Sequence, residues 1–359
     1  MRIKKIAVIG LGLIGGSLAK SLKHSIPTLE IAAYDYPEIV DKALSEKVID
    51  KDLKSYQDAL DSDLIFIALP INESLKVFNE LSPMLKGTQI ISDLCSVKGI
   101  FADSWKQSNS EGCYIGAHPM AGKEKGGFQN SDNLLFENSV FIISDQSKGY
   151  DTLEDYLEVI KNLGVKITFV NPYLHDKIIS RVSHLPQLLS VLLVNQAALN
   201  ENGFNFLDFG AGGFRDMTRI AGSDFGIWES IIAGNKKEII NSLSSFRNDV
   251  DKIINMIEND SFKELADRFE KARTAREEIP FNNKGFLSPL YDISIFLKDE
   301  PGMIAKLSKI LFENKINIKD LELLKIREGS GGNFKLYFES EAEAKTAKAL
   351  LEKFGFKTS

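Results

Sequence analysis

A histidine in the stretch GAHPMAGKEKGGF, residues 116–128, has the surroundings expected of a proton acceptor. His118 lies between two glycine-bearing turns and directly before a proline, in a chain that has four histidines. An imidazole with an ordinary pKa near ~6.5 is well matched to accept a proton at neutral pH. We therefore interpret His118 as a candidate active-site residue. The alternative is a loop histidine that only caps a turn.

A glycine-rich turn near the N-terminus has the spacing of a phosphate-binding loop. Gly10, Gly12 and Gly15 form G-x-G-x-x-G between an apolar run and a helical pattern that begins with Leu13 and Ile14. The first glycine permits a tight bend, the second lets the backbone approach a pyrophosphate, and the third lets helix and strand pack closely. The phosphates then lie on the helix N-terminus. The pattern predicts a dinucleotide-binding turn, with a glycine turn that only packs as the alternative.

The next strand signal, at 29–35, ends on an acid. Asp35 lies twenty residues beyond Gly15, where a carboxylate can accept hydrogen bonds from the adenosine ribose hydroxyls. A carboxylate in that place repels a 2′-phosphate. The sequence therefore predicts NAD rather than NADP as the cofactor.

Alternating strands and helices must position these side chains. Further strand signals alternate with helical patterns as far as residue 171, and this predicts an α/β domain over 1–171 with a largely parallel, Rossmann-type doubly wound sheet. Ligands of such sheets bind beyond the carboxyl ends of the strands. Pro70, Ser96 and His118 follow strand signals, so we expect them at the nicotinamide end of the cofactor. The further strand signals lie at 63–70, 88–93, 113–118, 139–144 and 165–170.

The segment 172–282 has the pattern of an all-α domain. Its apolar residues recur at helical spacing, a kink is predicted at Pro186, and no strand signal interrupts the later helices. Many of its faces are apolar, so we expect a homodimer in which this domain packs against a second copy. A glycine-rich loop is predicted at 210–228. Its arginines, Arg215 and Arg219, could hold a dicarboxylate through bidentate pairs, or the loop could be a simple connection.

The last segment, 289–359, changes character again. It has the signals of a strand, a turn at 299–302, a helix, two strands and a second helix, with 355–359 left for a short final strand. The pattern predicts a small βαββα(β) domain. The stretch 281–289 before it is expected to be a linker.

The composition argues against several classes of protein. The formal net charge is −6 with acids and bases interspersed, which gives no electrostatic case for nucleic acid or an anionic membrane as partner. Two cysteines, Cys95 and Cys113, suit a reducing cytoplasm. The N-terminus contains glycines and lacks a cleavage site for a targeting segment. We expect a cytoplasmic protein with no membrane span, since no apolar run approaches ~20 residues. We also expect no metal, since no cluster has ligand spacing.

Five motifs, in order, resemble those of the prephenate dehydrogenase family. They are GLGLIGGSLA near the N-terminus, DLCSVK at 93–98, HPMAGKEKGG at 118–127, HDKIISRVSHLP at 175–186 and GGFRDMTRIAGSD at 212–224. The last segment resembles the ACT class of amino-acid-sensing modules through DEPGMI and INIKDLE. The resemblance covers nearly the whole chain. It implies an NAD-binding domain, a helical substrate and dimerisation domain, and an ACT-like regulatory domain.

The resemblance implies oxidative decarboxylation of prephenate to 4-hydroxyphenylpyruvate, a step of tyrosine biosynthesis. In this family the histidine of H-P-M-A-G polarises the substrate hydroxyl, and this role falls here on His118. The serine of S-V-K, here Ser96, would hydrogen-bond the same hydroxyl or the imidazole. Both residues are therefore expected to be catalytic.

The resemblance also implies a substrate-binding set. The arginine of T-R-I-A, Arg219, would anchor a substrate carboxylate, and Glu124 would help to form an ionic gate. His184 belongs to the S-H-L-P motif, although it could equally be a hydrogen-bonded core histidine. The expected set is Arg219, Gln187, Glu124, Asp216, Gly213 and His184.

Two positions depart from the usual pattern of the family. Lys123 stands where a small hydroxyl residue is common, and Gln187 stands where a second histidine is common. Glutamine has a donor, an acceptor and no charge, so it lacks the repulsion with which a protonated histidine rejects an ammonium group. We therefore expect Gln187 at the substrate's side chain and a relaxed discrimination between prephenate and arogenate.

For the ACT-like segment, the resemblance implies control by an aromatic amino acid, with tyrosine as the expected effector. The expected effector-binding residues are Asp299, Pro301, Gly302, Asn317 and Ile318. Three other functions remain open: an arogenate dehydrogenase, a non-catalytic amino-acid sensor, and an unrelated NAD-dependent hydroxyacid dehydrogenase. The presence of His118, Ser96 and Arg219 argues against a sensor. The hydroxyacid dehydrogenase predicts a catalytic lysine on the long helix, and no lysine there has a convincing context.

Overall fold

The computed structural model describes residues 2–123, 125–278, 290–327 and 331–358. They form two compact units, Met1–Ala266 and Asp267–Ser359. The first unit contains a parallel sheet followed by helices, and the second contains a small antiparallel sheet.

Six parallel strands form the central sheet of the first unit. They are β1 (Lys5–Ile9), β2 (Glu30–Tyr34), β3 (Lys51–Asp52), β4 (Leu64–Ile67), β5 (Ile90–Asp93) and β6 (Cys113–Tyr114). Their order is β3-β2-β1-β4-β5-β6. The central strands are apolar and buried on both faces, as expected of a parallel sheet covered on both sides. Along β1, Ile6 and Val8 pack in one core cluster, whereas Ala7 and Ile9 pack in another.

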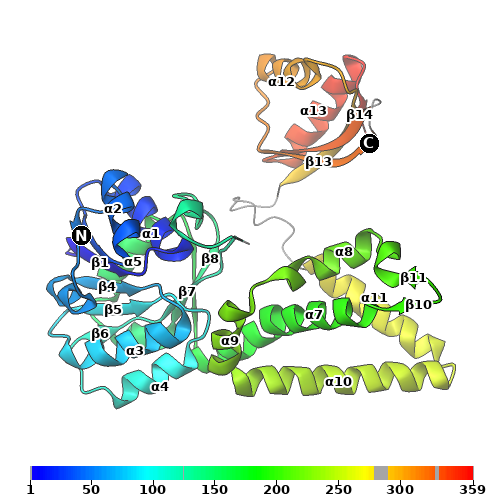
Figure 1. Cartoon of the computed structure of the whole chain (residues 1–359). Coiled ribbons are helices and arrows are strands. Elements are labelled where there is room, and N and C mark those ends of the chain that lie inside the picture. The colour runs from blue at the N-terminus through cyan, green and yellow to red at the C-terminus, as the bar shows by residue number, and fades with distance from the viewer. Residues whose placement is uncertain (1, 124, 279–289, 328–330, 359) are drawn as a thin grey trace. The chain divides into compact units, whose positions relative to one another are not determined.

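Helices cover both faces of this sheet (Figure 1). They are α1 (Leu13–Ser25), α2 (Pro37–Ser45), α3 (Ile71–Leu81), α4 (Gly99–Gln107) and α5 (Leu153–Lys161). Leu18 of α1, Val40 of α2 and Tyr156 of α5 share one core cluster. Phe78 of α3 and Phe101 of α4 lie in the other cluster, with their rings edge to face at 5.5 Å. The predicted doubly wound, Rossmann-type fold is confirmed.

A second, three-stranded sheet holds the candidate base. The single strand expected at 113–118 is wrong: the chain leaves the central sheet after β6, and β7 (Ala117–Pro119) pairs antiparallel with β8 (Val140–Ser144). β8 in turn pairs parallel with β9 (Lys166–Val170). Gly116 makes this corner possible, because a Cβ there would stand 2.5 Å from the Tyr114 hydroxyl. His118 is therefore fixed in a strand, opposite Ile142.

The helical segment begins with one long run that changes its winding. Asn171 caps its start, because its Oδ1 accepts a hydrogen bond from the backbone N–H of Tyr173 at 3.1 Å. The predicted disturbance near Pro186 takes the form of a π-helical turn, since proline cannot donate the usual backbone bond. The run comprises α6 (Pro172–Ile179), the π turn η5 (Ser180–His184) and α7 (Leu185–Ala197). It is followed by α9 (Phe225–Gly234), α10 (Lys236–Glu258) and α11 (Phe262–Glu278).

A short two-stranded ribbon, β10 (Asn200–Glu201) and β11 (Phe204–Asn205), lies before the later helices, which run from α9 to α11 without a strand between them, as expected. One expectation for this segment is wrong. The stretch expected to be a glycine-rich loop contains a helix, α8 (Gly212–Thr218), and a 3₁₀ turn, η7 (Arg219–Gly222). A Cβ on either of the two glycines that start α8 would meet nothing within 4 Å. Clustered glycines are typical of a loop, so the sequence did not predict a helix here.

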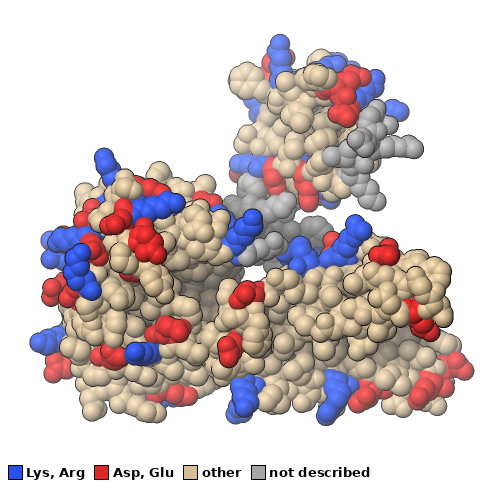
Figure 2. Space-filling model, viewed as in Figure 1, with Lys and Arg blue, Asp and Glu red and all other residues tan. Residues whose placement is uncertain are grey.

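The helical run from Pro172 to Ala197 is long and apolar enough to span a membrane by length and composition, contrary to the expectation from sequence. Its polar residues His175, Asp176 and His184 are buried in the first unit, as in a core helix. Its other faces are exposed and apolar: Val182 is 62% and Leu192 is 51% exposed. In Figure 2, most of the surface over α7 and α8 is formed by residues other than acids and bases. This surface has the character expected of an interface with a second copy.

The second unit has the predicted βαββαβ order. Its elements are β12 (Tyr291–Leu297), α12 (Met303–Glu313), β13 (Asp320–Arg327), β14 (Gly331–Phe338), α13 (Glu341–Lys353) and β15 (Lys357–Thr358). The sheet order is β13-β14-β12-β15. Ile295, Leu307, Phe338 and Leu351 pack between the sheet and the helices. This is the small sheet expected of the ACT-like module.

Candidate active site

The glycine turn after β1 has the geometry that a pyrophosphate requires. Gly10 has φ +95°, and a Cβ on Gly15 would stand 1.8 Å from the Gly10 carbonyl oxygen, so neither position accepts a side chain. Nothing lies within 4 Å of a Cβ on Gly12, where the backbone faces open space. Helix α1 starts at Leu13 with no acid in its first turn, which leaves its N-terminus suited to an anion. The residues present fit a dinucleotide.

Asp35 follows β2 beside this turn. Its Oδ2 accepts a hydrogen bond from the backbone N–H of Leu11 at 2.5 Å, and its Oδ1 accepts one from Tyr36 at 2.6 Å. Each carboxylate oxygen can accept more than one hydrogen bond, so both remain able to receive ribose hydroxyls. The structure places Asp35 where the sequence predicted it.

Two cavities meet at His118. The first has a volume of about 420 Å³ and reaches the nucleotide turn through Ile14 and Pro70. The second has a volume of about 270 Å³ and is lined from the helical segment by His184 and Trp228. Ser96 lines both cavities beside His118. The imidazole therefore stands between a space next to the cofactor turn and a space in the helical segment.

A hydrogen-bonded chain fixes the orientation of this imidazole. His118 Nδ1 lies 2.8 Å from His175 Nε2, and His175 Nδ1 lies 2.8 Å from Asp176 Oδ1. A carboxylate only accepts, so His175 donates from Nδ1 and its neutral ring accepts at Nε2. His118 must then donate from Nδ1. The lone pair of His118 Nε2 is left available to take a proton from a substrate.

Asp176 is itself held by backbone donors at the start of α4. Its Oδ1 accepts from the N–H of Lys98 and its Oδ2 accepts from the N–H of Gly99, both at 2.8 Å. The buried Lys98 ammonium pairs with Asp93, which also accepts from the Tyr114 hydroxyl at 2.7 Å. The motif DLCSVK thus contributes Ser96 to the lining of both cavities, and its Lys98 holds Asp176 through the backbone N–H and Asp93 through the ammonium group.

Burial keeps the histidines of the site neutral. Desolvation lowers the pKa of His118 well below its usual range, with smaller contributions from the neighbouring His175 and Lys98. Desolvation also lowers the pKa of His175, although Asp176 opposes this. The pKa of His184 is lowered to about 4, mainly by desolvation. At neutral pH the His118 ring is therefore in the form that accepts a proton.

His184 and Gln187 lie on successive turns of the long helical run. His184 is buried, packs edge to face against Trp228 with ring centroids 5.8 Å apart, and has Nδ1 3.3 Å from the Asn235 amide nitrogen. It therefore lines the second cavity and is also a hydrogen-bonded core histidine. Gln187 is buried, but its amide binds the backbone of η7 and lies outside the lining of both cavities.

The remaining substrate-binding candidates are not brought to these cavities. Gly213 and Asp216 on α8 and Arg219 on η7 are exposed, and neither cavity is lined by them. Glu124 lies outside the described residues. Lys123 pairs with Asp132 at 3.0 Å.

Sequence reasoning missed the partners of the base. It recognised the motif that contains His175 and Asp176 but assigned neither residue to the site. The adjacent histidine and aspartate at the start of the motif HDKIISRVSHLP were the available signal. Their contact with His118 spans 57 residues of sequence and could be seen only in the fold.

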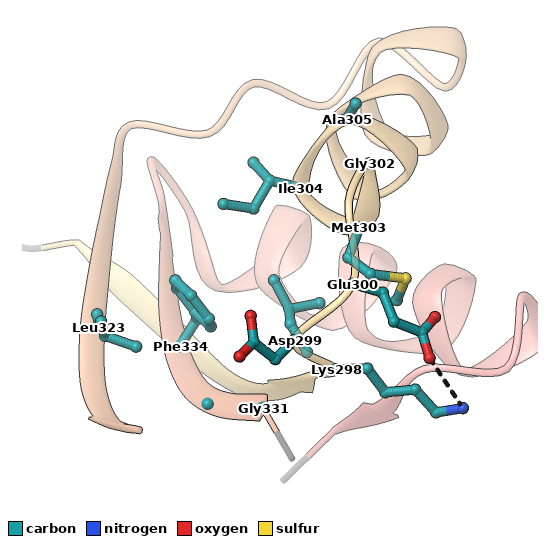
Figure 3. Close-up of a pocket in the computed structure, with 12 residues that line it drawn as sticks. Lys298, Asp299, Glu300, Gly302, Met303, Ile304, Ala305, Leu323, Gly331 and Phe334 are labelled. Atoms are coloured by element: carbon teal, nitrogen blue, oxygen red, sulfur yellow. Dashed lines mark ion pairs between the residues drawn. The ribbon is translucent and has the colours of Figure 1, made fainter. Parts of the chain in front are cut away.

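The C-terminal unit contains a separate cavity of about 340 Å³ at the turn that starts α12. Asp299 and Gly302 line it, whereas Pro301, Asn317 and Ile318 do not. Figure 3 shows the Asp299 carboxylate between this turn and Phe334, while Lys298 extends away to pair with Glu300 at 3.8 Å. The rest of the lining is largely apolar: Leu297, Met303, Ile304, Ala305 and Leu323.

A dinucleotide bound along the glycine turn would reach the first cavity, and a substrate in the second would meet the lone pair of His118. Such an arrangement defines a dehydrogenase that uses a nicotinamide dinucleotide. The chain belongs to the prephenate dehydrogenase family. The family's nucleotide-binding domain matches residues 18–169 and its dimerization domain matches residues 171–271. The chain is an NAD-dependent member of this family.

Individual relatives agree with this assignment. Prephenate dehydrogenase of Bacillus subtilis is 32% identical over 356 residues, which cover 97% of this chain and 95% of that protein. The structure of prephenate dehydrogenase from A. aeolicus with hydroxyphenyl propionate and NAD+ matches with a TM-score of 0.70 and 27% identity, over 78% of this chain and 99% of that chain. The structure of Synechocystis arogenate dehydrogenase matches with a TM-score of 0.68 and 28% identity, over 76% and 99%.

Proposed function

We propose that this chain oxidises prephenate with NAD and releases 4-hydroxyphenylpyruvate and carbon dioxide. The observation that carries the proposal is the His118 imidazole, which lies between the two cavities with its Nε2 lone pair available. NAD, when bound, accepts the hydride from the ring carbon that bears the hydroxyl. His118 takes the hydroxyl proton as that hydride leaves, and Asp176 stabilises the resulting positive charge through His175.

The loss of carbon dioxide needs little from the protein. The electron pair of the carbon–carboxylate bond enters the ring, which becomes aromatic, and the ring oxygen recovers its proton from His118. The reaction therefore consumes no net proton. The protein's own contribution is to place the ring carbon against the nicotinamide side and its hydroxyl against His118 and Ser96.

The test is NADH formation by the purified chain with prephenate and with arogenate, side by side. Prephenate is expected to give the higher kcat/KM. Arogenate is the second candidate substrate, because the chain matches an arogenate dehydrogenase structure. A higher kcat/KM with arogenate would assign the chain to that reaction. No turnover of either substrate would contradict the proposed function.

We expect Asp35→Ser to raise the use of NADP relative to NAD by about tenfold, because loss of the carboxylate removes at least ~1 kcal/mol of repulsion toward a 2′-phosphate. The serine hydroxyl can still accept one of the two backbone hydrogen bonds. The measurement is kcat/KM for both cofactors in the parent and the variant. A parent that already prefers NADP would show that Asp35 does not read the ribose.

The assembly we propose is a cytoplasmic homodimer built through the helical segment. Its exposed apolar residues and the match to a dimerization domain support this. Arg219, Asp216 and Gly213 lie off the cavities of their own chain but on this segment. In the proposed dimer we expect these residues to contact the substrate at the edge of an active site.

We also propose that the C-terminal unit binds an aromatic amino acid that controls activity, with tyrosine as the expected effector. The cavity has two carboxylates in its lining, Asp299 and the Lys298-paired Glu300, beside an apolar side that includes Phe334. An amino acid could place its ammonium group at Asp299 and its ring against the apolar side. The other predicted positions, Pro301, Asn317 and Ile318, lie outside this cavity and would contact an effector only from a second copy.

Removal of residues from about 288 onward is expected to leave catalysis intact and to abolish the response to tyrosine. The two solved relatives correspond to about three quarters of this chain, which supports folding of the shortened form. Initial rates with and without tyrosine or phenylalanine are the measurement. Asp299→Asn in the full chain should weaken the response without changing the uninhibited rate. Full tyrosine sensitivity in the shortened chain would place inhibition at the active site instead.

A further inference from the structure

Gln187 is buried, with 5% of its surface exposed, in the first turn of α7. Its Nε2 donates to the Ile220 carbonyl oxygen at 2.9 Å, and its Oε1 accepts from the Ser223 hydroxyl at 3.5 Å. The single O–H of Ser223 lies closer to the Ile220 carbonyl oxygen, at 2.8 Å, so it is shared between these two acceptors. Both ends of the amide therefore face one short segment, 220–223.

That segment connects two parts of the site. It follows Arg219 in η7, and it precedes Asp224, which caps α9 by accepting from the Gly226 N–H at 2.8 Å. Helix α9 contributes Ile231 to both cavities and Trp228 to the second. The Gln187 amide thus links α7 by a hydrogen bond to the turn that precedes α9, the helix that lines both cavities.

We infer that Gln187 is a positioning residue: it holds η7 and the start of α9 against α7, and does not itself contact the substrate. A side chain that contacts the substrate would line a cavity, as His184 does three residues earlier. Gln187 lines neither cavity, and one of its two amide N–H groups donates to the Ile220 carbonyl oxygen. The inference rests on the proposed function, because one of its readouts is turnover.

Three substitutions at this position separate the two roles. Gln187→Glu keeps the size but replaces the N–H donor by an acceptor that faces the Ile220 carbonyl. Gln187→Met keeps the volume and removes both hydrogen bonds. Gln187→His retains a ring N–H that can donate to the same carbonyl. The matched control is Gln196→Glu, an exposed glutamine on the same helix.

We expect Gln187→Glu and Gln187→Met to raise KM for prephenate by about tenfold, the effect of one lost hydrogen bond, with KM for NAD unchanged. Gln187→His and Gln196→Glu should remain near the parent. The ratio of kcat/KM for prephenate to that for arogenate should stay constant in every variant. Hydrogen exchange should become faster in the segment 219–226 of the Glu and Met variants only.

Two results would overturn the inference. A shift of the substrate ratio by about tenfold in Gln187→His would show direct contact with the substrate's side chain. Unchanged hydrogen exchange at 219–226 in Gln187→Met would show that the amide does not hold this segment. The exchange measurement needs no turnover, so it tests the inference even if the chain acts on neither substrate. A parent that turns over neither substrate contradicts the proposed function alone.

Discussion

His118→Asn is expected to lower kcat by about 10²–10⁴-fold with little change in KM for prephenate or NAD. The interaction between the imidazole and the substrate hydroxyl strengthens chiefly as the proton leaves, so its loss affects the transition state more than binding. Asparagine keeps a donor for His175 Nε2 but has no basic nitrogen for the substrate. Steady-state kinetics of the parent, His118→Asn and the exposed control His24→Asn are the measurement. Activity within about threefold of the parent would remove His118 from the mechanism.

The pH dependence of the parent gives a second readout of the same residue. Burial lowers the pKa of His118, so protonation removes the base only at a pH well below its usual value. The kcat/KM of the parent should therefore stay flat from neutral pH down through pH ~6.5 and should fall only well below that value. The residual activity of His118→Asn should lack this acid limb. An acid limb above pH ~7 in the parent would show that the imidazole is not kept neutral by burial.

Asp176→Asn is expected to lower kcat by about 10²–10⁴-fold through the tautomers of two histidines. If the new amide nitrogen faces His175, it donates to Nδ1, and His175 must then donate from Nε2 to His118. The proton of His118 moves to Nε2, where it faces the substrate and blocks proton transfer. If the amide is turned the other way, its oxygen still accepts from His175 and the tautomers are kept. In the first orientation the amide nitrogen faces the Lys98 N–H, and in the second it faces the Gly99 N–H, so either orientation leaves one buried backbone donor unpaired, at a cost of about 1–3 kcal/mol.

The two orientations of the introduced amide differ in their effect on kcat, so kcat and the stability of the fold must be measured separately. The midpoint of thermal unfolding and the affinity for NAD report the fold, and kcat reports the tautomer. We expect NAD affinity to be retained, because Asp176 lies away from the glycine turn. A folded Asp176→Asn protein with kcat within about threefold of the parent would contradict the expected exchange of tautomers.

The sequence predicted those parts of the site that depend on local geometry. Gly10, Gly12 and Gly15 are required by one turn, and Asp35 is placed by the length of a single helix and strand, so spacing alone was sufficient. The strand corner at Gly116 was not predictable in the same way. It depends on contact with the Tyr114 hydroxyl and on pairing with β8, whose residues lie further along the chain.

His175 and Asp176, the side chains that orient His118, were not predicted, for the same physical reason. His118 and His175 carry ordinary residue types, and only the packing of α6 against β7 and α4 brings them together. The helix at 212–218 was expected to be a loop because its glycines suggested turns, whereas tertiary packing against α7 decides its structure. The role of Gln187 was predicted from its place in a motif, and its hydrogen bonds indicate a different partner.

The bond between His118 and His175 joins a strand of the nucleotide-binding part to a helix of the dimerization part. The order in which the chain folds therefore matters to its chemistry. A nascent chain that has emerged only as far as residue 171 already contains the glycine turn and Asp35 but has no partner for the imidazole. The cofactor turn and the imidazole are thus encoded ahead of His175 and Asp176, which orient the imidazole, so competence for reaction arrives only when α6 docks.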